Sequence, residues 1–183
     1  MAQKVKLSTI AESLGLSTAT ISLALRDSPL VAADTRDKIK EQARALGYIY
    51  NRRAASLRTS RSGIVGVVFH DVMNPFYGEI LKAIESELDR SRQTFILSNH
   101  YDSVEKQRTF IETLLQLGSD GIIMSPAIGT PIEDMTLAEE NGMPAILVAR
   151  SMDGVDMPTY RGDDSYGISL ATNHLISLGH RTI

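Results

Sequence analysis

The chain has 183 residues, of which 43% are hydrophobic, and this suits a folded protein of one large or two small domains. It contains no cysteine, so disulfide bonds and thiolate chemistry are excluded. No apolar stretch approaches the roughly 18 residues of a membrane span, and the first residues lack the apolar run of a signal peptide. We therefore expect a cytoplasmic protein without a membrane partner.

The net charge of −3 is unevenly distributed along the chain. Residues 1–62 hold 11 Lys and Arg against 5 Asp and Glu, whereas residues 63–183 hold 8 against 17. A basic first third joined to an acidic remainder is typical of a nucleic-acid-binding head attached to a part that does not bind nucleic acid. The alternative is a solvated face that happens to be basic.

Two short apolar-periodic segments, joined at a glycine, open the chain. In residues 7–14 the apolar side chains share one side of a helix, and Gly15 supplies the left-handed backbone that ends a helix cheaply. Ser17 is the expected N-cap of a second helix. That helix would turn Ile21, Ala24 and Leu25 inward. Its opposite face would then present Thr18, Ala19, Ser22, Leu23 and Arg26.

This arrangement matches the needs of a DNA-binding helix-turn-helix, whose second helix must project from a small core into a major groove. Any antiparallel helix pair in a small core is the alternative. A third helix is expected over residues 33–46, so residues 1–50 would form a small all-α head. The arginine-rich stretch 51–62 has the composition of a linker. It is also a candidate hinge helix that forms once its charges are neutralised.

From Gly63 onward the pattern changes to short apolar runs rich in β-branched residues. We expect strands at 64–69, 94–98, 121–124 and 145–148, and helices over 75–92, 104–117 and 132–141. This alternation predicts a parallel α/β sheet with helices on both faces. Asn74 and Pro75 form a helix start, and Asp102 and Glu105 have capping-box spacing for the next helix.

The last residues predict three further elements. We expect a short fifth strand at 159–162, a helix over 166–178 and the beginning of another strand at 180–183. A strand cut at its start suggests that the sequence is a fragment.

Seven motifs in a fixed order carry a family resemblance. They are LSTIAESLGLSTATIS, VAADTRDKIKEQARALGY, NRRAASL, IVGVV, NPFYGEILKAIE, DGIIM and GDDSYGISLATNHLISLGHRTI. In this order they resemble the LacI/GalR (lactose-repressor) family of bacterial transcription regulators. The resemblance implies an all-α helix-turn-helix head at 1–50 and a hinge at 51–62. It also implies an α/β parallel-sheet lobe of a type I periplasmic-binding-protein-like domain at 63–163, with the truncated start of a second lobe at 164–183.

Family members are typically homodimers that bind pseudo-palindromic operators in double-stranded DNA. The resemblance implies a repressor whose operator affinity is controlled by a small-molecule effector, such as a sugar or related metabolite. Because only the start of a second lobe is present, we expect the isolated chain to be poorly stable and to lack effector affinity.

The resemblance also assigns DNA contacts. Leu23 departs from the basic or imidazole side chain that reads a guanine in many relatives, so we expect an apolar contact with a thymine methyl or no readout there. Leu57 matches the hinge leucine that enters the minor groove, and Tyr50 replaces the proline common before the hinge. The full expected set is Lys6, Ser17, Thr18, Ala19, Ser22, Leu23, Arg26, Arg36, Asn51, Arg52, Arg53, Ala54 and Leu57.

Effector contacts are expected beyond the carboxyl ends of the strands, where open α/β sheets bind their ligands. The candidates are Asp71, Phe76, Tyr77, Ser125, Arg150 and Asp163. Phe76 suits stacking on a sugar or base, and Arg150 and Asp163 match positions that hold polar ligand groups in the family. Each of these three has an alternative role: Phe76 in the core, Arg150 in a surface ion pair, and Asp163 as a helix cap.

Catalysis finds little support in the sequence, and we expect neither an enzyme nor a cofactor. His70, His100, His174 and His180 lie too far apart for a helical metal pair, so we expect structural or surface histidines. The sequence has no nucleophile elbow, P-loop or dinucleotide fingerprint. The rival to a transcription regulator is a cytoplasmic small-ligand-binding module without specific DNA recognition.

Overall fold

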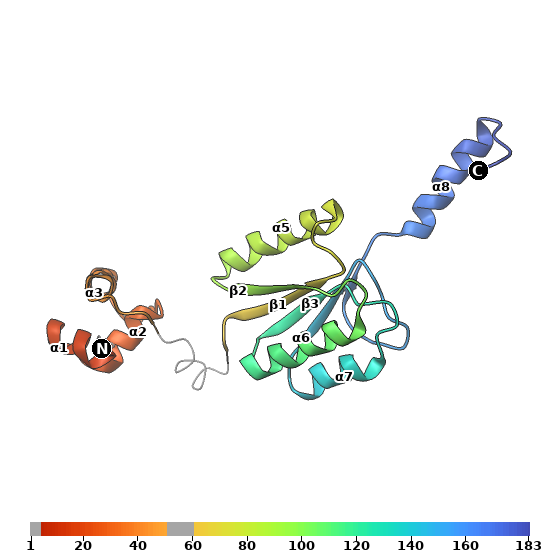
Figure 1. Ribbon diagram of the computed structural model, residues 1–183. Coiled ribbons are helices and arrows are strands. Elements are labelled where there is room, and N and C mark those ends of the chain that lie inside the picture. Colours follow the sequence, from red (N-terminus) through yellow and green to blue (C-terminus); the bar gives the residue numbers. More distant parts are fainter. Residues whose placement is uncertain (1–4, 51–60) are drawn as a thin grey trace. The chain divides into compact units, whose positions relative to one another are not determined.

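The computed structural model describes residues 5–50 and 61–183. The chain divides into two compact units, Met1–Ala55 and Ser56–Ile183 (Figure 1). Within the described part of the chain, no helix combines the length and the apolar character needed to cross a membrane.

The first unit contains three helices, α1 (Leu7–Leu14), α2 (Thr18–Leu25) and α3 (Ala33–Ala45). Gly15 ends α1 with a φ of 64°, as the sequence predicts. The hydroxyl of Ser17 caps α2 by accepting a hydrogen bond from the backbone N–H of Thr20 at 3.1 Å. One fully buried isoleucine from each helix forms the centre of the core: Ile10, Ile21 and Ile39.

The second unit is built on a five-stranded sheet. Its strands are β1 (Ile64–Phe69), β2 (Thr94–Asn99), β3 (Gly121–Met124), β4 (Ala145–Val148) and β5 (Thr159–Tyr160). The order across the sheet is β2-β1-β3-β4-β5, and every neighbouring pair is parallel. The predicted parallel sheet is therefore confirmed. Its carboxyl ends all meet at one edge, and its amino ends meet at the other.

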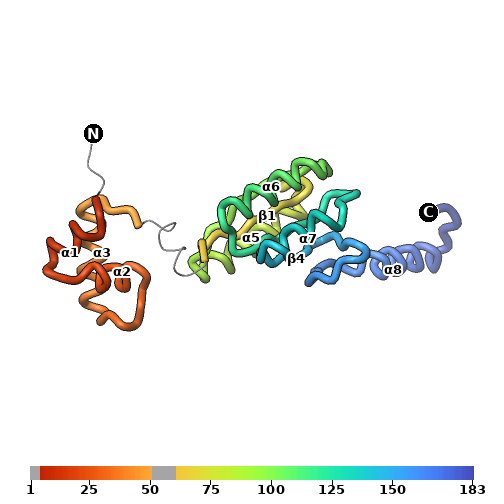
Figure 2. The backbone as a smooth tube through the Cα atoms, turned by 90° about the horizontal axis from the view of Figure 1, so that it is seen from below, coloured from red at the N-terminus to blue at the C-terminus, as the bar shows by residue number. Residues whose placement is uncertain are grey.

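Helices cover both faces of this sheet. Helix α5 (Pro75–Arg90) lies on one face, and α6 (Val104–Leu117) and α7 (Ile132–Glu140) lie on the other (Figures 1 and 2). The larger core lies under α6 and α7, around Leu114, Met124 and Leu147. A smaller core lies under α5, around Val67, Phe69 and Tyr77. The side-chain amide oxygen of Asn74 caps α5, and Pro75 occupies its first turn, as predicted.

Two local predictions are wrong. Ser103, not Asp102, caps α6 and accepts from the backbone N–H of Lys106 at 3.2 Å. Asp102 adopts a φ of 60°, and its carboxylate bonds to other loops instead. The last helix, α8 (Asp164–Ser177), forms as expected and has no buried residue, but residues 180–183 form no strand. A strand needs a hydrogen-bonded neighbour, and no described strand pairs with this segment.

Candidate functional site

The carboxyl edge of the sheet gathers loops from four strands around Asp102. Its Oδ1 accepts hydrogen bonds from Nη1 of Arg150 at 2.5 Å and from the backbone N–H of Ile128 at 3.2 Å. Its Oδ2 lies 3.0 Å from Nδ1 of His70. Arg150 also donates to the carbonyl of Pro126 at 3.0 Å. One carboxylate thus links the segments that follow β1, β3 and β4 to the segment after β2.

The charges in this cluster stabilise one another. The hydrogen bond from Arg150 lowers the pKa of Asp102, and the same bond raises the pKa of Arg150. Both groups therefore remain ionised at neutral pH. In this structure Arg150 forms an ion pair with Asp102, which is the alternative role expected for it. A contact between Arg150 and an effector stays a prediction.

A buried histidine supports the same edge. Nε2 of His100 donates to the carbonyl of Ser125 at 2.8 Å, and Nδ1 accepts from the backbone N–H of Asp102 at 2.9 Å. Because Nδ1 accepts, the ring is the neutral tautomer with its hydrogen on Nε2. Burial lowers the pKa of His100, which keeps the ring neutral. His100 thus fixes Tyr101 and Asp102 in left-handed backbone conformations, with φ of 49° and 60°.

Folding brings together His70, His100 and Asp102, whose ligand atoms lie within 4.8 Å of one another. Sequence reasoning missed this cluster because the two histidines are distant along the chain. Both ring nitrogens of His100 already make hydrogen bonds, and the guanidinium of Arg150 opposes a cation beside Asp102. The donor set therefore fits a hydrogen-bond network better than a metal site.

Two of the predicted effector residues lie in the core. The hydroxyls of Tyr77 and Ser125 are buried and 3.1 Å apart, and the Tyr77 ring stacks on Phe69 with centroids 5.1 Å apart. Phe76 is the opposite case. Its side chain is 56% exposed, so the core alternative for Phe76 is wrong and its ring is available for stacking.

Two predicted aspartates at this edge serve the local backbone. Oδ1 of Asp71 accepts from the backbone N–H of Met73 at 2.9 Å. Oδ1 of Asp163 accepts from the backbone N–H of Tyr166 at 2.9 Å and caps α8. The alternative of a helix cap is therefore the role that Asp163 has in this structure, and its ligand role remains a prediction.

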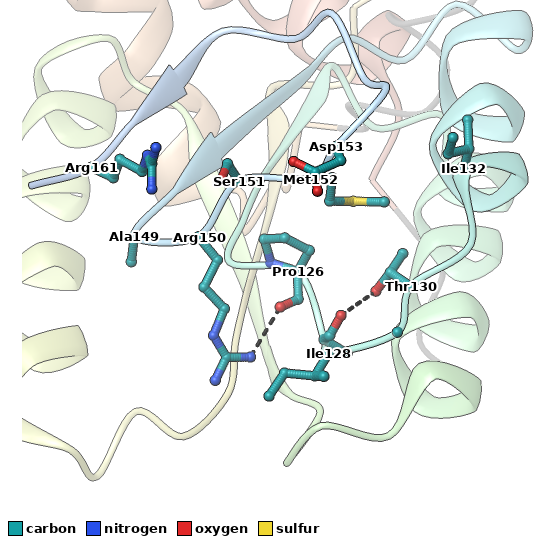
Figure 3. Close-up of a pocket in the computed structure, with 12 residues that line it drawn as sticks. Pro126, Ile128, Thr130, Ile132, Ala149, Arg150, Ser151, Met152, Asp153 and Arg161 are labelled. Carbon is teal, nitrogen blue, oxygen red and sulfur yellow. Dashed lines mark hydrogen bonds between the residues drawn. The ribbon is translucent and has the colours of Figure 1, made fainter. Parts of the chain in front are cut away.

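A pocket of about 570 Å³ opens beside Arg150 (Figure 3). It lies between the loop after β3, at 126–130, and the loop after β4, at 149–153, with Arg161 completing its wall. Arg150 is the only predicted effector residue in the lining. Sequence reasoning missed Ile128, Met152 and Asp153, which lie several residues beyond the strand ends. Their only sequence signal is their position in the two loops that follow β3 and β4.

The first unit carries the second candidate site, at the N-terminal end of α2. Ser17, Thr18, Ala19 and Arg26 are exposed, as predicted. Ser22 is only 5% exposed, so its predicted place on the outward face is wrong, and Leu23 packs against the core. The reason is that α2 is short and contacts both α1 and α3, which buries more than one side of it.

Two other predicted phosphate contacts lie in different surroundings. Lys6 is exposed just before α1. Nη1 of Arg36 donates to the carbonyl of Asp27 at 3.3 Å, and the carboxylate of Asp27 pairs with Lys40. A phosphate contact by Arg36 would therefore compete with this intramolecular bond. The predicted contacts at Asn51, Arg52, Arg53, Ala54 and Leu57 lie outside the described residues.

Comparison with known proteins defines the class of the second unit. Residues 62–183 match the family described as periplasmic binding proteins and sugar binding domain of LacI family. A crystal structure of the lac repressor dimer bound to operator and the anti-inducer ONPF aligns with a TM-score of 0.77 and 27% identity. This alignment covers 98% of this chain and 55% of that chain. The second unit has a periplasmic-binding-protein-like fold built on a parallel α/β sheet.

The particular family follows from the sequence relatives. The chain is 31% identical over 183 residues to the maltose regulon regulatory protein MalI of Escherichia coli K12, covering all of this chain and 53% of MalI. It is 31% identical over 175 residues to the transcriptional regulator GalS of Salmonella typhimurium LT2, covering 95% of this chain and 51% of GalS. The chain belongs to the LacI/GalR family. It spans about half the length of the curated relatives it matches.

Proposed function

We propose that this chain is part of a sequence-specific DNA-binding transcription regulator, a repressor whose operator affinity is controlled by a small-molecule effector. The observation that carries the proposal is the exposed N-terminal end of α2, with Ser17, Thr18 and Ala19, in a three-helix unit at the basic end of the chain. A helix presented in this way has the geometry of a helix-turn-helix recognition helix. Membership of the LacI/GalR family supports the same function.

We infer that the first unit acts as the helix-turn-helix head. Thr18 and Ala19 would contact base edges, because their short side chains permit close approach to the major groove. Lys6 would contact phosphates and supply salt-dependent affinity without sequence preference. Leu57 would enter the minor groove at the operator centre, where unstacking one base step costs on the order of a few kcal/mol.

We infer that the second unit contributes half of an effector site. The pocket beside Arg150 lies at the carboxyl ends of β3 and β4, where ligands of open parallel sheets bind. The exposed ring of Phe76 would stack on a ring face of the effector, which we propose to be a sugar or related metabolite. Effector binding would change the orientation of two lobes, and in a homodimer this would change the spacing of the two heads.

The alternative function is a small-ligand-binding module whose basic first unit makes no specific DNA contact. The pocket beside Arg150 would serve either function equally well. The two functions differ in their use of α2, so DNA selection separates them.

The test is selection of bound sequences from a randomised duplex pool, using the full-length protein and its Leu57→Ala variant. A palindrome with a central pyrimidine–purine step, lost in the variant, is the expected result. Salt-sensitive binding without any consensus would contradict specific recognition and favour the ligand-binding module.

A further inference from the structure

The start of β1 is held by one carboxylate from a distant part of the sequence. Oδ1 of Asp120 accepts hydrogen bonds from the backbone N–H of Ser62 at 2.7 Å and from the Ser62 hydroxyl at 3.0 Å. Oδ2 accepts from the backbone N–H of Gly63 at 3.0 Å. Both carboxylate oxygens are used, and all three donors belong to the two residues that precede β1.

Backbone hydrogen bonds tie Gly63 and Ile64 to the start of β2 and to the residue that precedes β3. The N–H of Thr94 donates to the carbonyl of Gly63, and the N–H of Asp120 donates to the carbonyl of Ile64, both at 2.8 Å. The Ser62 hydroxyl also accepts from the N–H of Ile64 at 3.1 Å. Gly63 has a φ of 71°, a conformation that L side chains adopt at a cost. The chain therefore enters the lobe at a defined place and in a defined direction.

The three hydrogen bonds to the carboxylate of Asp120, called the Asp120 clamp below, do more than align the sheet. The register of β1 is already set by six residue pairs with β2 and four with β3. Ser62 and Asp120 are half-buried polar residues at the amino edge, away from the apolar core and at the opposite edge from the pocket beside Arg150. What the three bonds add is a restraint on the chain that precedes β1.

We propose that Asp120 is a positioning residue that fixes where the chain leaves the lobe toward the DNA-binding head. This inference rests on the proposed function. In a homodimer, the two heads must bind two half-sites that lie at a fixed spacing. Once the first head is bound, the effective concentration of the second head at its half-site depends on how the chain that connects it to the lobe is restrained. Asp120 thereby sharpens the preference of the dimer for one half-site spacing.

The experiment uses the full-length protein and three duplexes: the operator selected above, the same operator with one base pair inserted at its centre, and an unrelated sequence. The variants are Asp120→Ala and Asp120→Asn. The side-chain amide of Asn has one accepting oxygen and one donating NH₂ group. In either orientation the NH₂ group faces a donor from Ser62 or Gly63, so a hydrogen bond of the wild type is lost. The matched control is Asp89→Asn, which removes the same charge from an exposed residue in the last turn of α5.

For both Asp120 variants we expect operator affinity to fall about tenfold, because the second head loses effective concentration. The affinity ratio between the two operator spacings should shrink toward one. Affinity for the unrelated duplex should stay unchanged, since phosphate contacts of the head are intact. Asp89→Asn should match the wild type on all three duplexes.

A merely structural role for Asp120 predicts a lower melting temperature with an unchanged spacing ratio, and this result would overturn the inference. Should Asp120→Ala fail to fold, Ser62→Ala decides the question. It removes only the hydroxyl from the Asp120 clamp, and it should lower the spacing ratio partway; an unchanged ratio would overturn the inference. A wild-type protein that selects no consensus would instead contradict the proposed function itself.

Discussion

Asp102 is the residue on which the carboxyl edge of the sheet depends. Its Oδ1 accepts hydrogen bonds from Arg150 and Ile128, and its Oδ2 lies 3.0 Å from Nδ1 of His70, so one charged group contacts three other segments of this edge. Capping-box spacing alone assigned it to the start of α6. The left-handed turn held by His100 directs it to Arg150 instead, and this turn has no signature in the local sequence.

Replacing Asp102 by Asn should lower the free energy of unfolding of the lobe by about 1 kcal/mol at pH 7, as for a partly exposed charged hydrogen bond. The Arg150 hydrogen bond holds the pKa of Asp102 below its usual 3.8. A lowered folded-state pKa contributes stability that is complete above pH 3.8 and is lost as the pH falls through the folded-state pKa. Urea unfolding of both proteins across this pH range measures the difference.

The matched variant is Arg150→Met, analysed with the double variant in a thermodynamic cycle. The two single changes should be non-additive, because each removes the same pair. Additive effects, or a difference that persists unchanged at the lowest pH, would show that Asp102 acts independently of Arg150.

Asp134, in the first turn of α7, should show the opposite pH dependence. It is 1% exposed, and burial raises its pKa. A raised folded-state pKa means that stability declines as pH rises from 3.8 through the folded-state pKa. Asp134→Asn should therefore raise the free energy of unfolding by about 1 kcal/mol at pH 7, and by less in acid.

The sign of the Asp134 prediction depends on its partner. Arg108 lies 3.2 Å from the carboxylate of Asp134, but its side chain is largely exposed and it also pairs with Glu112 at 3.3 Å. Because Arg108 is largely exposed, removing the Asp134 charge does not leave Arg108 as a buried cation without a partner. The same urea series measures this variant, and a loss of stability at pH 7 would contradict the argument.

Strand β1 and helix α6 are in contact through a glycine. A Cβ added to Gly66 would lie 2.1 Å from Cδ1 of Leu114, a buried residue at the centre of the larger core. Gly66→Ala should therefore cost about 2 to 3 kcal/mol of unfolding free energy through overpacking. Thermal or urea unfolding, followed by the helical circular dichroism signal, measures the loss.

The double variant Gly66→Ala, Leu114→Ala tests whether this contact is the cause. Leu114→Ala alone should cost about 3 kcal/mol by creating a cavity, and the added methyl group would fill part of that cavity. The double variant should thus lose less than the sum of the two single changes. A loss equal to the sum would mean that the destabilisation by Gly66→Ala does not come from the contact with Leu114.

The two compact units divide the chemistry between them. The Met1–Ala55 unit carries most of the excess positive charge, and the Ser56–Ile183 unit carries the acidic lobe with its pocket. We expect long-range attraction of DNA to the first unit only. Because of this division, we expect the salt dependence of DNA binding to come from individual Lys and Arg residues of the first unit.

Lys6→Ala should weaken binding to every duplex alike and reduce the slope of log affinity against log salt by about 0.9, the value for one phosphate contact. Lys82→Ala, an exposed lysine on α5, is the matched control and should leave the slope unchanged. Titrations at several salt concentrations give both slopes. An equal change in the two variants would indicate a general charge effect rather than a contact by Lys6.

Local sequence signals account for most of the fold. Gly15, Ser17 and Asn74 mark helix ends through backbone conformation and capping hydrogen bonds, which depend on a few neighbouring residues. The alternation of apolar runs with helical patterns also predicts the parallel sheet, because each run and each helical pattern is a local feature of the sequence. Strand pairing and the burial of Ser22 depend on contacts between distant segments, which the period of one helix does not reveal.

The amino-acid sequence was sufficient for the family, the order of the elements and the edge of the sheet at which a ligand is expected, because periodicity and ordered motifs carry this information. The tertiary structure alone decided which side chains meet at the two edges. It paired Asp102 with Arg150, placed Tyr77 and Ser125 in the core, and brought the carboxylate of Asp120 within hydrogen-bond distance of Ser62. These contacts join residues 48 to 58 positions apart, and only the parallel crossover connections bring such residues within hydrogen-bond distance.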